Sequence, residues 1–162
     1  MRWNEINQMT CSVARSLSVV GDRWTMLILR DAFLGVRRFE DFQSDLRMTR
    51  HRLADRLRKL VADGILTRVE YAQRPKRFEY RLTEKGVDLY PVVVALLRWG
   101  DRWMAGADGP PIELVHRKCG EHILPAFTCP HCNEQLDARE MTARPGPALR
   151  KKMAQAPARM GK

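Results

Sequence analysis

The sequence contains no long hydrophobic run. Its longest apolar stretch, residues 92–97, is bounded by Pro91 and Arg98, whereas a membrane-spanning helix needs about 20 apolar residues. The polar first ten residues also lack the apolar segment and small-residue cleavage site of a secretory signal. These absences exclude a membrane span and predict a cytoplasmic protein.

Acidic side chains are scarce in two parts of the chain. Of 162 residues, 29 are Lys or Arg and 19 are Asp or Glu, so the formal net charge is +10. Residues 47–82 carry eleven basic and four acidic side chains, and residues 144–162 carry six basic and none acidic. A basic segment inside a folded domain favours a surface that binds a polyanion, although a merely solvated basic surface would have the same composition.

The motifs of the common enzyme classes are also missing. We find no Gly-rich phosphate-binding loop, no Ser-His-Asp ordering and no internal repeat. The 44% of hydrophobic residues nevertheless suffices for a globular core. The chain is therefore predicted to fold and to bind a partner, and not to be an enzyme.

Hydrophobic periodicity predicts four helices followed by a β-hairpin. The first helix covers residues 11–20, and the second begins after Asp22 as its cap and ends at Gly35. A brief extended segment at 37–39 precedes a short helix ending near residue 48, and Thr49 is the cap of a fourth helix that runs to Asp63. Residues 65–71 and 78–82 are rich in β-forming side chains, and segment 72–77 between them has the polarity and proline of a hairpin tip.

A further helical segment begins at Thr83 and carries a long apolar surface between residues 92 and 103. Pro91 either divides it into two helices or lies in the first turn of the second. One small domain seldom needs so much apolar helix, so we expect part of this surface to pair two subunits; closure of the monomer's own core is the alternative.

The composition divides the chain into three parts. Residues 1–105 form the predicted helical domain, and a linker at 106–111 leads to a Cys- and His-containing extension at 112–143. Residues 144–162, which contain Pro and Gly but no acid, are predicted to be a disordered basic tail.

The predicted order of elements is that of a winged helix-turn-helix, whose fourth helix enters the major groove of DNA. Leu53, Leu57 and Leu60 would pack that helix inward and leave its basic side chains facing outward. Arginine can read guanine through two parallel hydrogen bonds, and the other cations contact phosphates. The candidate DNA-binding residues are Thr49, Arg50, His51, Arg52, Arg56, Lys59, Arg74, Lys76 and Arg77. Arg58 and Arg68 are either phosphate contacts or solvated cations.

Several short motifs also follow one another at regular intervals. They are Cys11-Ser12-Val13-Ala14-Arg15, Gly21-Asp22-Arg23-Trp24-Thr25, Ile28-Leu29-Arg30-Asp31, Arg37-Arg38-Phe39, Leu53-Ala54-Asp55-Arg56-Leu57, Asp63-Gly64-Ile65-Leu66, Phe78-Glu79-Tyr80-Arg81-Leu82-Thr83 and Arg98-Trp99-Gly100. Together they resemble the signature of the HxlR-type, MarR-like winged helix-turn-helix transcription regulators, over about residues 11–103.

The resemblance implies a dimeric bacterial or archaeal regulator in which the terminal helices pair the subunits. Its two recognition helices would meet a pseudo-palindromic operator, and repression is the more common mode in the family. The recognition helix here opens Met48-Thr49-Arg50-His51-Arg52, which is more basic than the family pattern. The operator of a relative therefore cannot be transferred to this chain.

Cys11 stands alone at the start of the first helix, where the helix dipole and Arg15 would favour the thiolate. Such a thiol is a candidate sensor of oxidants or electrophiles, and the resemblance supports this role because some HxlR-type regulators sense quinones, aldehydes or oxidants through a cysteine in this position. A small buried hydrophobe is the alternative. Trp24 and Trp99 are candidate lining residues of a small-molecule effector pocket, although large aromatics are more often core.

The other three cysteines are grouped with a histidine. His116, Cys119, Cys129 and Cys132 form two pairs with two residues inside each pair and nine between the pairs, the double-knuckle spacing of a tetrahedral zinc site. His122 and His131 are rival ligands to His116. Reduced thiols without metal, or a disulfide formed only on oxidation, are the alternatives. Three thiolates and one imidazole leave no open coordination position, so a bound zinc would be structural.

The sequence thus predicts a mainly α protein with a small β-hairpin (α+β class). The architecture is a winged helix-turn-helix with a long C-terminal dimerisation helix and a small zinc-ribbon-like appendage. The predicted function is a sequence-specific, homodimeric DNA-binding transcription regulator, with a repressor favoured. The alternative is a winged-helix module that binds proteins and has lost specific DNA binding.

Overall fold

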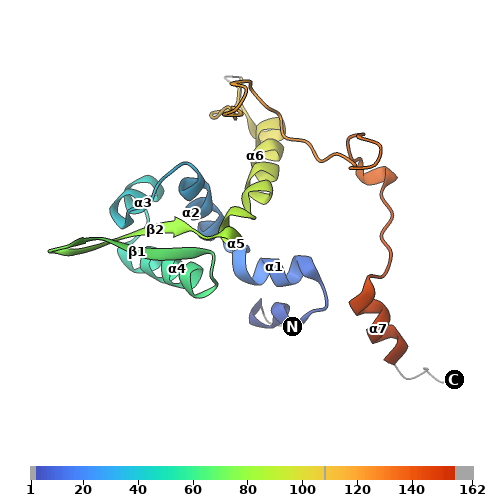
Figure 1. Ribbon diagram of the computed structural model, residues 1–162, viewed down its shortest axis with the longest axis horizontal. Helices are drawn as coiled ribbons and strands as arrows, with labels where there is room; N and C mark the ends of the chain where they lie inside the picture. Colours follow the sequence, from blue (N-terminus) through green and yellow to red (C-terminus); the bar gives the residue numbers. More distant parts are fainter. Residues whose placement is uncertain (1–2, 108, 156–162) are drawn as a thin grey trace.

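The computed structural model describes residues 3–107 and 109–155. In chain order, its elements are η1 (Trp3–Gln8), α1 (Ser12–Val20), α2 (Arg23–Phe33), α3 (Phe39–Leu46), α4 (Arg50–Ala62), β1 (Leu66–Gln73), β2 (Lys76–Leu82), α5 (Glu84–Val87), α6 (Tyr90–Met104), η2 (Ala138–Glu140) and α7 (Pro147–Gln155). Figure 1 shows the β1–β2 hairpin projecting from a helical body, α6 projecting in another direction, and a drawn-out C-terminal segment ending in α7. This mainly helical fold with one antiparallel hairpin confirms the predicted class.

Two of the predicted caps are formed by side chains. Asp22 accepts hydrogen bonds from two backbone N–H groups in the first turn of α2, at 3.0 and 3.3 Å. Thr83 accepts one from the backbone N–H of Gly86 at 3.1 Å and so caps α5. Thr49 occupies the N-cap position of α4, but its side chain makes no capping hydrogen bond. These helix starts were predicted correctly because the capping signal is local.

The core lies between α2, α3, α4 and the base of the hairpin. Leu53, Leu57 and Leu60 face it from α4, and each is at most 1% exposed, as the periodicity predicted. The other buried members of the cluster are Val20, Ile28, Leu29, Phe42, Leu46, Met48, Ile65 and Leu66. Burying one such side chain contributes about 1.5–3 kcal/mol. One face of α4 is therefore held firmly, and the opposite face is turned to solvent.

The hairpin is longer than predicted. β1 and β2 pair in antiparallel register as far as Gln73 and Lys76, so the turn consists of Arg74 and Pro75 alone rather than all of 72–77. Backbone pairing does not depend on the polarity of side chains that point to solvent, which is why a polar tip can remain strand. The expected short pairing segment before α3 is present, since Arg38 forms a β-bridge with Glu79.

The apolar segment that follows the hairpin forms two helices, α5 and α6, as one of the predicted arrangements has it. Pro91 lies in the first turn of α6, where its missing N–H costs no hydrogen bond. α6 packs on α2, and the rings of Phe33 and Tyr90 meet edge to face with centroids 5.1 Å apart. Only one side of α6 is covered, because Trp99 and Trp103 remain 56% and 65% exposed. Among the described residues, no helix is long and apolar enough to cross a membrane.

The basic tail differs from its prediction. Residues 147–155 form α7, whereas the sequence was expected to lack regular structure throughout 144–162. Pro147 occupies the start of the helix, where its fixed φ is suited to helix, and the Ala, Leu, Arg, Lys, Met and Gln that follow are strong helix formers. No residue of α7 is buried, so propensity rather than packing explains it. The rest of the tail, residues 156–162, lies outside the described residues.

Asp31 is a charged side chain inside the core, at 3% exposure. Its Oδ1 accepts a hydrogen bond from Arg30 Nε at 2.7 Å, while its Oδ2 is buried and makes no hydrogen bond within the described part of the chain. Burial raises the pKa of this carboxyl above its ordinary value of 3.8, and this outweighs the opposing hydrogen bond and charge of Arg30.

A methyl group at Gly86 should destabilise the fold. A Cβ there would lie well inside contact distance of the backbone carbonyl oxygen of Ile65, which cannot move aside as a flexible side chain can. We expect Gly86→Ala to lower the free energy of unfolding by about 1–3 kcal/mol, measured by urea denaturation. In the control Gly106→Ala, the added Cβ meets nothing within 4 Å, and the change should stay below about 1 kcal/mol. Equal effects of both variants would contradict the packing shown.

Asp31 should make stability depend on pH in a defined direction. Because its pKa is raised in the folded state, the carboxyl's contribution to stability is fully present below its unfolded pKa and is lost as pH rises through its folded pKa. Asp31→Asn, which cannot ionise, should therefore be more stable than the native chain at about pH 7, with the difference shrinking toward about pH 3. Denaturation curves of both proteins across this range measure it. A difference that does not change with pH would refute the assignment.

Candidate nucleic-acid interface

The helix-turn-helix consists of α3, a three-residue turn and α4. Arg47 ends α3 in the left-handed conformation, with φ 49° and ψ 36°, and reverses the chain direction. Met48 is buried, and Thr49 then begins α4 on the surface. The turn therefore anchors α4 at its start and leaves its first residues exposed.

The first turn of α4 presents three exposed basic side chains, as predicted. Arg50 places its guanidinium over the ring of Phe39, 5.0 Å from the centroid. His51 Nδ1 lies 3.2 Å from Asp55 Oδ2. Arg52 is exposed beside the N-terminus of α2 and lines a cleft there. These side chains lie at the end of the helix that enters a DNA groove in winged-helix proteins.

Farther along α4, the predicted cations are paired with carboxylates. Arg56 Nε lies 3.3 Å from Asp22 Oδ1, and Lys59 Nζ lies 2.7 Å from Asp63 Oδ2. Arg58, which the sequence left open between phosphate contact and solvated cation, has Nη1 2.8 Å from Asp55 Oδ1. Such exposed pairs contribute little to stability, about 0.2–1 kcal/mol. A phosphate can therefore compete with the carboxylates for these cations at small cost.

The hairpin and α4 form the two walls of a polar cleft of about 390 Å³. Four cations from three elements line it: Arg50 from α4, Arg68 from β1, and Lys76 and Arg77 from β2. The aromatic side chains Phe39, Tyr71, Phe78 and Tyr80 line it between them. The cleft thus unites candidates from α4, the recognition helix, and from the β1–β2 hairpin, which is the wing. One carboxylate, Glu40, also lines it, so four cations leave the cleft positively charged, which suits a phosphate backbone. Arg74, at the tip, is not among the residues that line it.

The structure adds two arginines of this region that the sequence did not identify as DNA-binding residues. Arg68, left as a possible solvated cation, lies over the ring of Phe78, 3.5 Å from its centroid, and reaches the cleft. Arg38 lies over Tyr71 at 5.0 Å and was not a candidate at all. The pairing of each arginine with an aromatic ring orients the guanidinium. The only signal in the sequence was the Arg37-Arg38 pair directly before α3.

A second cleft, of about 240 Å³, lies where the N-terminus of α2 meets α4. Arg23, Arg52 and Arg56 line it together with Trp24. Asp22 and Asp55 also line it, and Asp22 already caps the N-terminus of α2 and pairs with Arg56, so the three arginines share the cleft with two carboxylates. Trp24 and Trp99 do not share a pocket, since Trp99 lines a different cavity on α6. In the single chain the two candidate tryptophans thus line different clefts, and the effector pocket stays a prediction.

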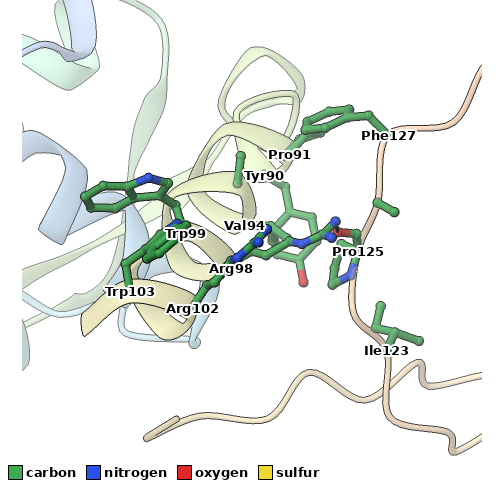
Figure 2. Close-up of a pocket in the computed structure, with 12 residues that line it drawn as sticks. Tyr90, Pro91, Val94, Arg98, Trp99, Arg102, Trp103, Ile123, Pro125 and Phe127 are labelled. Atoms are coloured by element: carbon green, nitrogen blue, oxygen red, sulfur yellow. Dashed lines mark hydrogen bonds between the residues drawn. The ribbon is translucent and has the colours of Figure 1, made fainter. Parts of the chain in front are cut away.

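That cavity, of about 420 Å³, lies between α6 and the extended segment 123–127. Figure 2 shows Ile123, Pro125 and Phe127 beside α6, with Arg98 directed toward Pro125. Arg98 Nη1 donates a hydrogen bond to the carbonyl oxygen of Pro125 at 2.6 Å. The C-terminal extension is thus attached to the long helix at this point.

Cys11 is exposed and occupies the N-cap position of α1, one residue before the helix. Its backbone carbonyl accepts the first hydrogen bond of the helix, from Arg15 N–H at 3.0 Å. Its thiol makes no capping hydrogen bond. In the single chain the thiol is therefore accessible to reagents, which argues against the alternative of a buried structural cysteine.

The four predicted metal ligands lie on two small hairpins, which we term the first knuckle (residues 114–123) and the second knuckle (residues 127–136). In the first, His116 Nδ1 lies 3.2 Å from Cys119 Sγ. In the second, backbone N–H groups of Cys132 and His131, and the Cys132 side chain, hydrogen-bond to the Cys129 thiol and lower its pKa. Each pair is thus assembled. The two pairs are not brought together, because the described residues contain no group of three or more His, Cys, Asp or Glu side chains placed to hold a metal ion.

Residues 19–108 match the profile of a family described as HxlR-like helix-turn-helix. Among curated relatives, the chain is 50% identical over 143 residues to an uncharacterised HTH-type transcriptional regulator of Mycobacterium tuberculosis, covering 88% of this chain and 90% of the relative. An alignment of 143 residues is longer than residues 1–105 and so extends into the C-terminal extension.

Two solved structures resemble the fold. The crystal structure of PA1607, described as a candidate transcription factor, superposes with a TM-score of 0.77 at 38% identity, covering 85% of this chain and 96% of that one. The redox regulator HypR in its reduced form superposes with a TM-score of 0.54 at 35% identity, covering 57% of this chain and 92% of that one. The first similarity extends beyond the winged helix, and the second covers little more than half of the chain.

Proposed function

Because the chain belongs to the HxlR-like helix-turn-helix family of transcriptional regulators, we propose that it binds a specific DNA operator as a homodimer and represses transcription there. The operator would be pseudo-palindromic, since a two-fold symmetric dimer presents two identical recognition helices. Arg50, His51 and Arg52 would read base edges in the major groove. The cations of the hairpin would contact the flanking backbone or minor groove.

The observation that carries this proposal is the shared cleft between α4 and the wing. Arg50, Arg68, Lys76 and Arg77 come from elements separated in sequence, yet all line the same cavity. The core-facing leucines of α4 fix the direction of its exposed cations. The basic side chains therefore share one face, which an excess of basic residues alone would not ensure. A solvated basic surface would not need cations of three elements around one cleft.

The uncovered apolar face of α6 supports the homodimer. Val92, Leu96, Trp99 and Trp103 are all at least 45% exposed along it. Val13 and Leu17 of α1 are also exposed, at 67% and 41%. Contiguous apolar side chains in water mark a surface that a partner covers. A second copy of the chain, which presents the same two helices, is the partner that the proposal requires.

Cys11 is the candidate for a signal input to this regulator. Its thiol is exposed at the start of α1, and α1 carries part of the apolar surface assigned to the dimer. Oxidation or alkylation there would add a group beside the proposed interface. The similarity to HypR, a redox regulator, supports this role.

The proposal is tested by capturing genomic DNA fragments that the purified protein retains at about 150 mM salt, where non-specific binding is weak. We expect a few discrete fragments that share an inverted repeat. Featureless recovery, or no retained DNA, would contradict the operator model and favour the protein-interaction module.

Charge reversal in the recognition helix should abolish operator affinity without unfolding the chain. Arg52 is exposed, so Arg52→Glu should weaken operator binding by about 10- to 100-fold or more while the thermal unfolding curve stays unchanged. The control is Arg139→Glu, which makes the same charge change at an exposed residue of η2. Fluorescence anisotropy on the captured fragment measures both. Equal losses in the two variants would indicate binding through overall charge and would refute specific readout by α4.

A further inference from the structure

The two knuckles repeat the same backbone structure at an interval of thirteen residues. In the first, the hydrogen bonds run from His116 N–H to Glu121 O (2.9 Å), from Gly120 N–H to His116 O (2.8 Å) and from Ile123 N–H to Leu114 O (2.9 Å). In the second, they run from Cys129 N–H to Glu134 O (2.8 Å), from Asn133 N–H to Cys129 O (2.8 Å) and from Leu136 N–H to Phe127 O (2.9 Å). Each of these three bonds has its counterpart in the other knuckle, and the first knuckle has one more, from Cys119 N–H to His116 O at 3.2 Å.

The turn conformations repeat as well. Gly120 and Asn133 occupy equivalent positions, and both have positive φ, 76° and 60°. An isolated β-bridge closes each knuckle, between Val115 and His122 in the first and between Thr128 and Gln135 in the second. The sequence shows no repeat because few side chains are shared. The two knuckles therefore share one backbone conformation.

What the two knuckles share chemically is the pair of ligands. Position one holds His116 or Cys129, and position four holds Cys119 or Cys132. Zinc bonds of about 2.3 Å to sulfur and 2.0–2.1 Å to nitrogen place two ligands of a tetrahedral site about 3.6 Å apart. The 3.2 Å between His116 Nδ1 and Cys119 Sγ is close to this separation. The first knuckle thus has the ligand spacing of half of a tetrahedral site, and the second repeats its backbone hydrogen bonds around Cys129 and Cys132.

The repeat also decides between the rival histidines. His122 lies on the returning arm of its knuckle, where its counterpart is Gln135, and its Nδ1 is 3.4 Å from Glu113 Oε2. His131 occupies the third position, where its counterpart is Lys118. Only His116 is equivalent to a cysteine, namely Cys129. The position in the repeat therefore identifies it as the fourth ligand.

We propose that the two knuckles close on each other around one structural Zn²⁺, held by His116, Cys119, Cys129 and Cys132 of the same chain. Three thiolates and one neutral imidazole give a closed site with one net negative charge. Arg117 and Lys118, exposed between the ligands of the first knuckle, offset that charge. The site has no open position and therefore no catalytic role.

Closure requires the knuckles to move together, because the described residues contain no assembled group of three or more ligands. Leu124, Pro125 and Ala126 join the knuckles, and Leu124 is 87% exposed, so no packed core opposes the movement. The hydrogen bond from Arg98 to Pro125 would keep the closed pair attached to α6. Metal binding of this kind is coupled to local folding.

The metal content of the full-length reduced protein is the first test. After incubation with Zn²⁺ and gel filtration, elemental analysis should find one zinc per chain. Cys119→Ser, Cys132→Ser and His116→Ala should each lose most of it, whereas the matched controls His122→Ala and His131→Ala should keep it. A native protein with almost no zinc would overturn the proposal, as would loss in His122→Ala together with retention in His116→Ala.

Coordination within one chain needs a separate experiment. The variants His116→Ala/Cys119→Ser and Cys129→Ser/Cys132→Ser each retain one knuckle, and we expect neither these nor their unfolded-and-refolded mixture to hold zinc. Recovery of zinc in the mixture would mean that two chains share the site and would overturn the single-chain proposal. Far-UV circular dichroism checks that the winged-helix domain of each variant is folded. Replacement of zinc by Co²⁺ in the native chain should give the visible bands of a tetrahedral thiolate site; an octahedral spectrum would contradict the ligand set.

Discussion

The burial of one face of α4 is the constraint on which the rest of the structure depends. Leu53, Leu57 and Leu60 are inserted into the core and cannot leave it without losing about 1.5–3 kcal/mol each. A helix held along one stripe cannot rotate about its axis. The exposed cations of α4 are therefore held in a fixed direction, and the same leucines that stabilise the domain orient its proposed DNA-reading surface.

The opposite situation holds for α6. Its packing against α2 through Phe33 and Tyr90 uses one side only, and the tryptophans on the uncovered side remain exposed. The sequence predicted this helix and its surplus of apolar surface, because both follow from composition and period. It could not tell a dimer surface from a monomer core, because that depends on which side α2 covers. The packing on α2 leaves the tryptophan side of α6 exposed in the single chain, and this is the side that the proposed homodimer would cover.

Predictions from the sequence succeeded where the determining contacts are local. The caps at Asp22 and Thr83 and the inward leucine stripe needed only neighbouring residues. Predictions failed where a side chain contacts a different helix or strand, and where intrinsic helix propensity forms a helix without packing. Arg68 reaches the Arg50 cleft only because β1 packs beside α4, and residues 147–155 form a helix although nothing covers it. The ion pair of Arg56 also depends on Asp22, the N-cap residue of another helix, α2.

Hydrophobic packing does not explain what stabilises the C-terminal extension. None of residues 109–155 is buried, so no apolar core stabilises the two knuckles, and chains this short seldom fold on apolar burial alone. Both knuckles are nevertheless built to the same pattern of hydrogen bonds, with turn residues that accept positive φ at the same place. Main-chain hydrogen bonds exposed to water contribute little net stability, so they do not account for two such hairpins in series. A cross-link between the knuckles would. Both knuckles present a Cys or His at positions one and four, and besides the shared Glu121 and Glu134 these are the side chains at equivalent places that bind zinc.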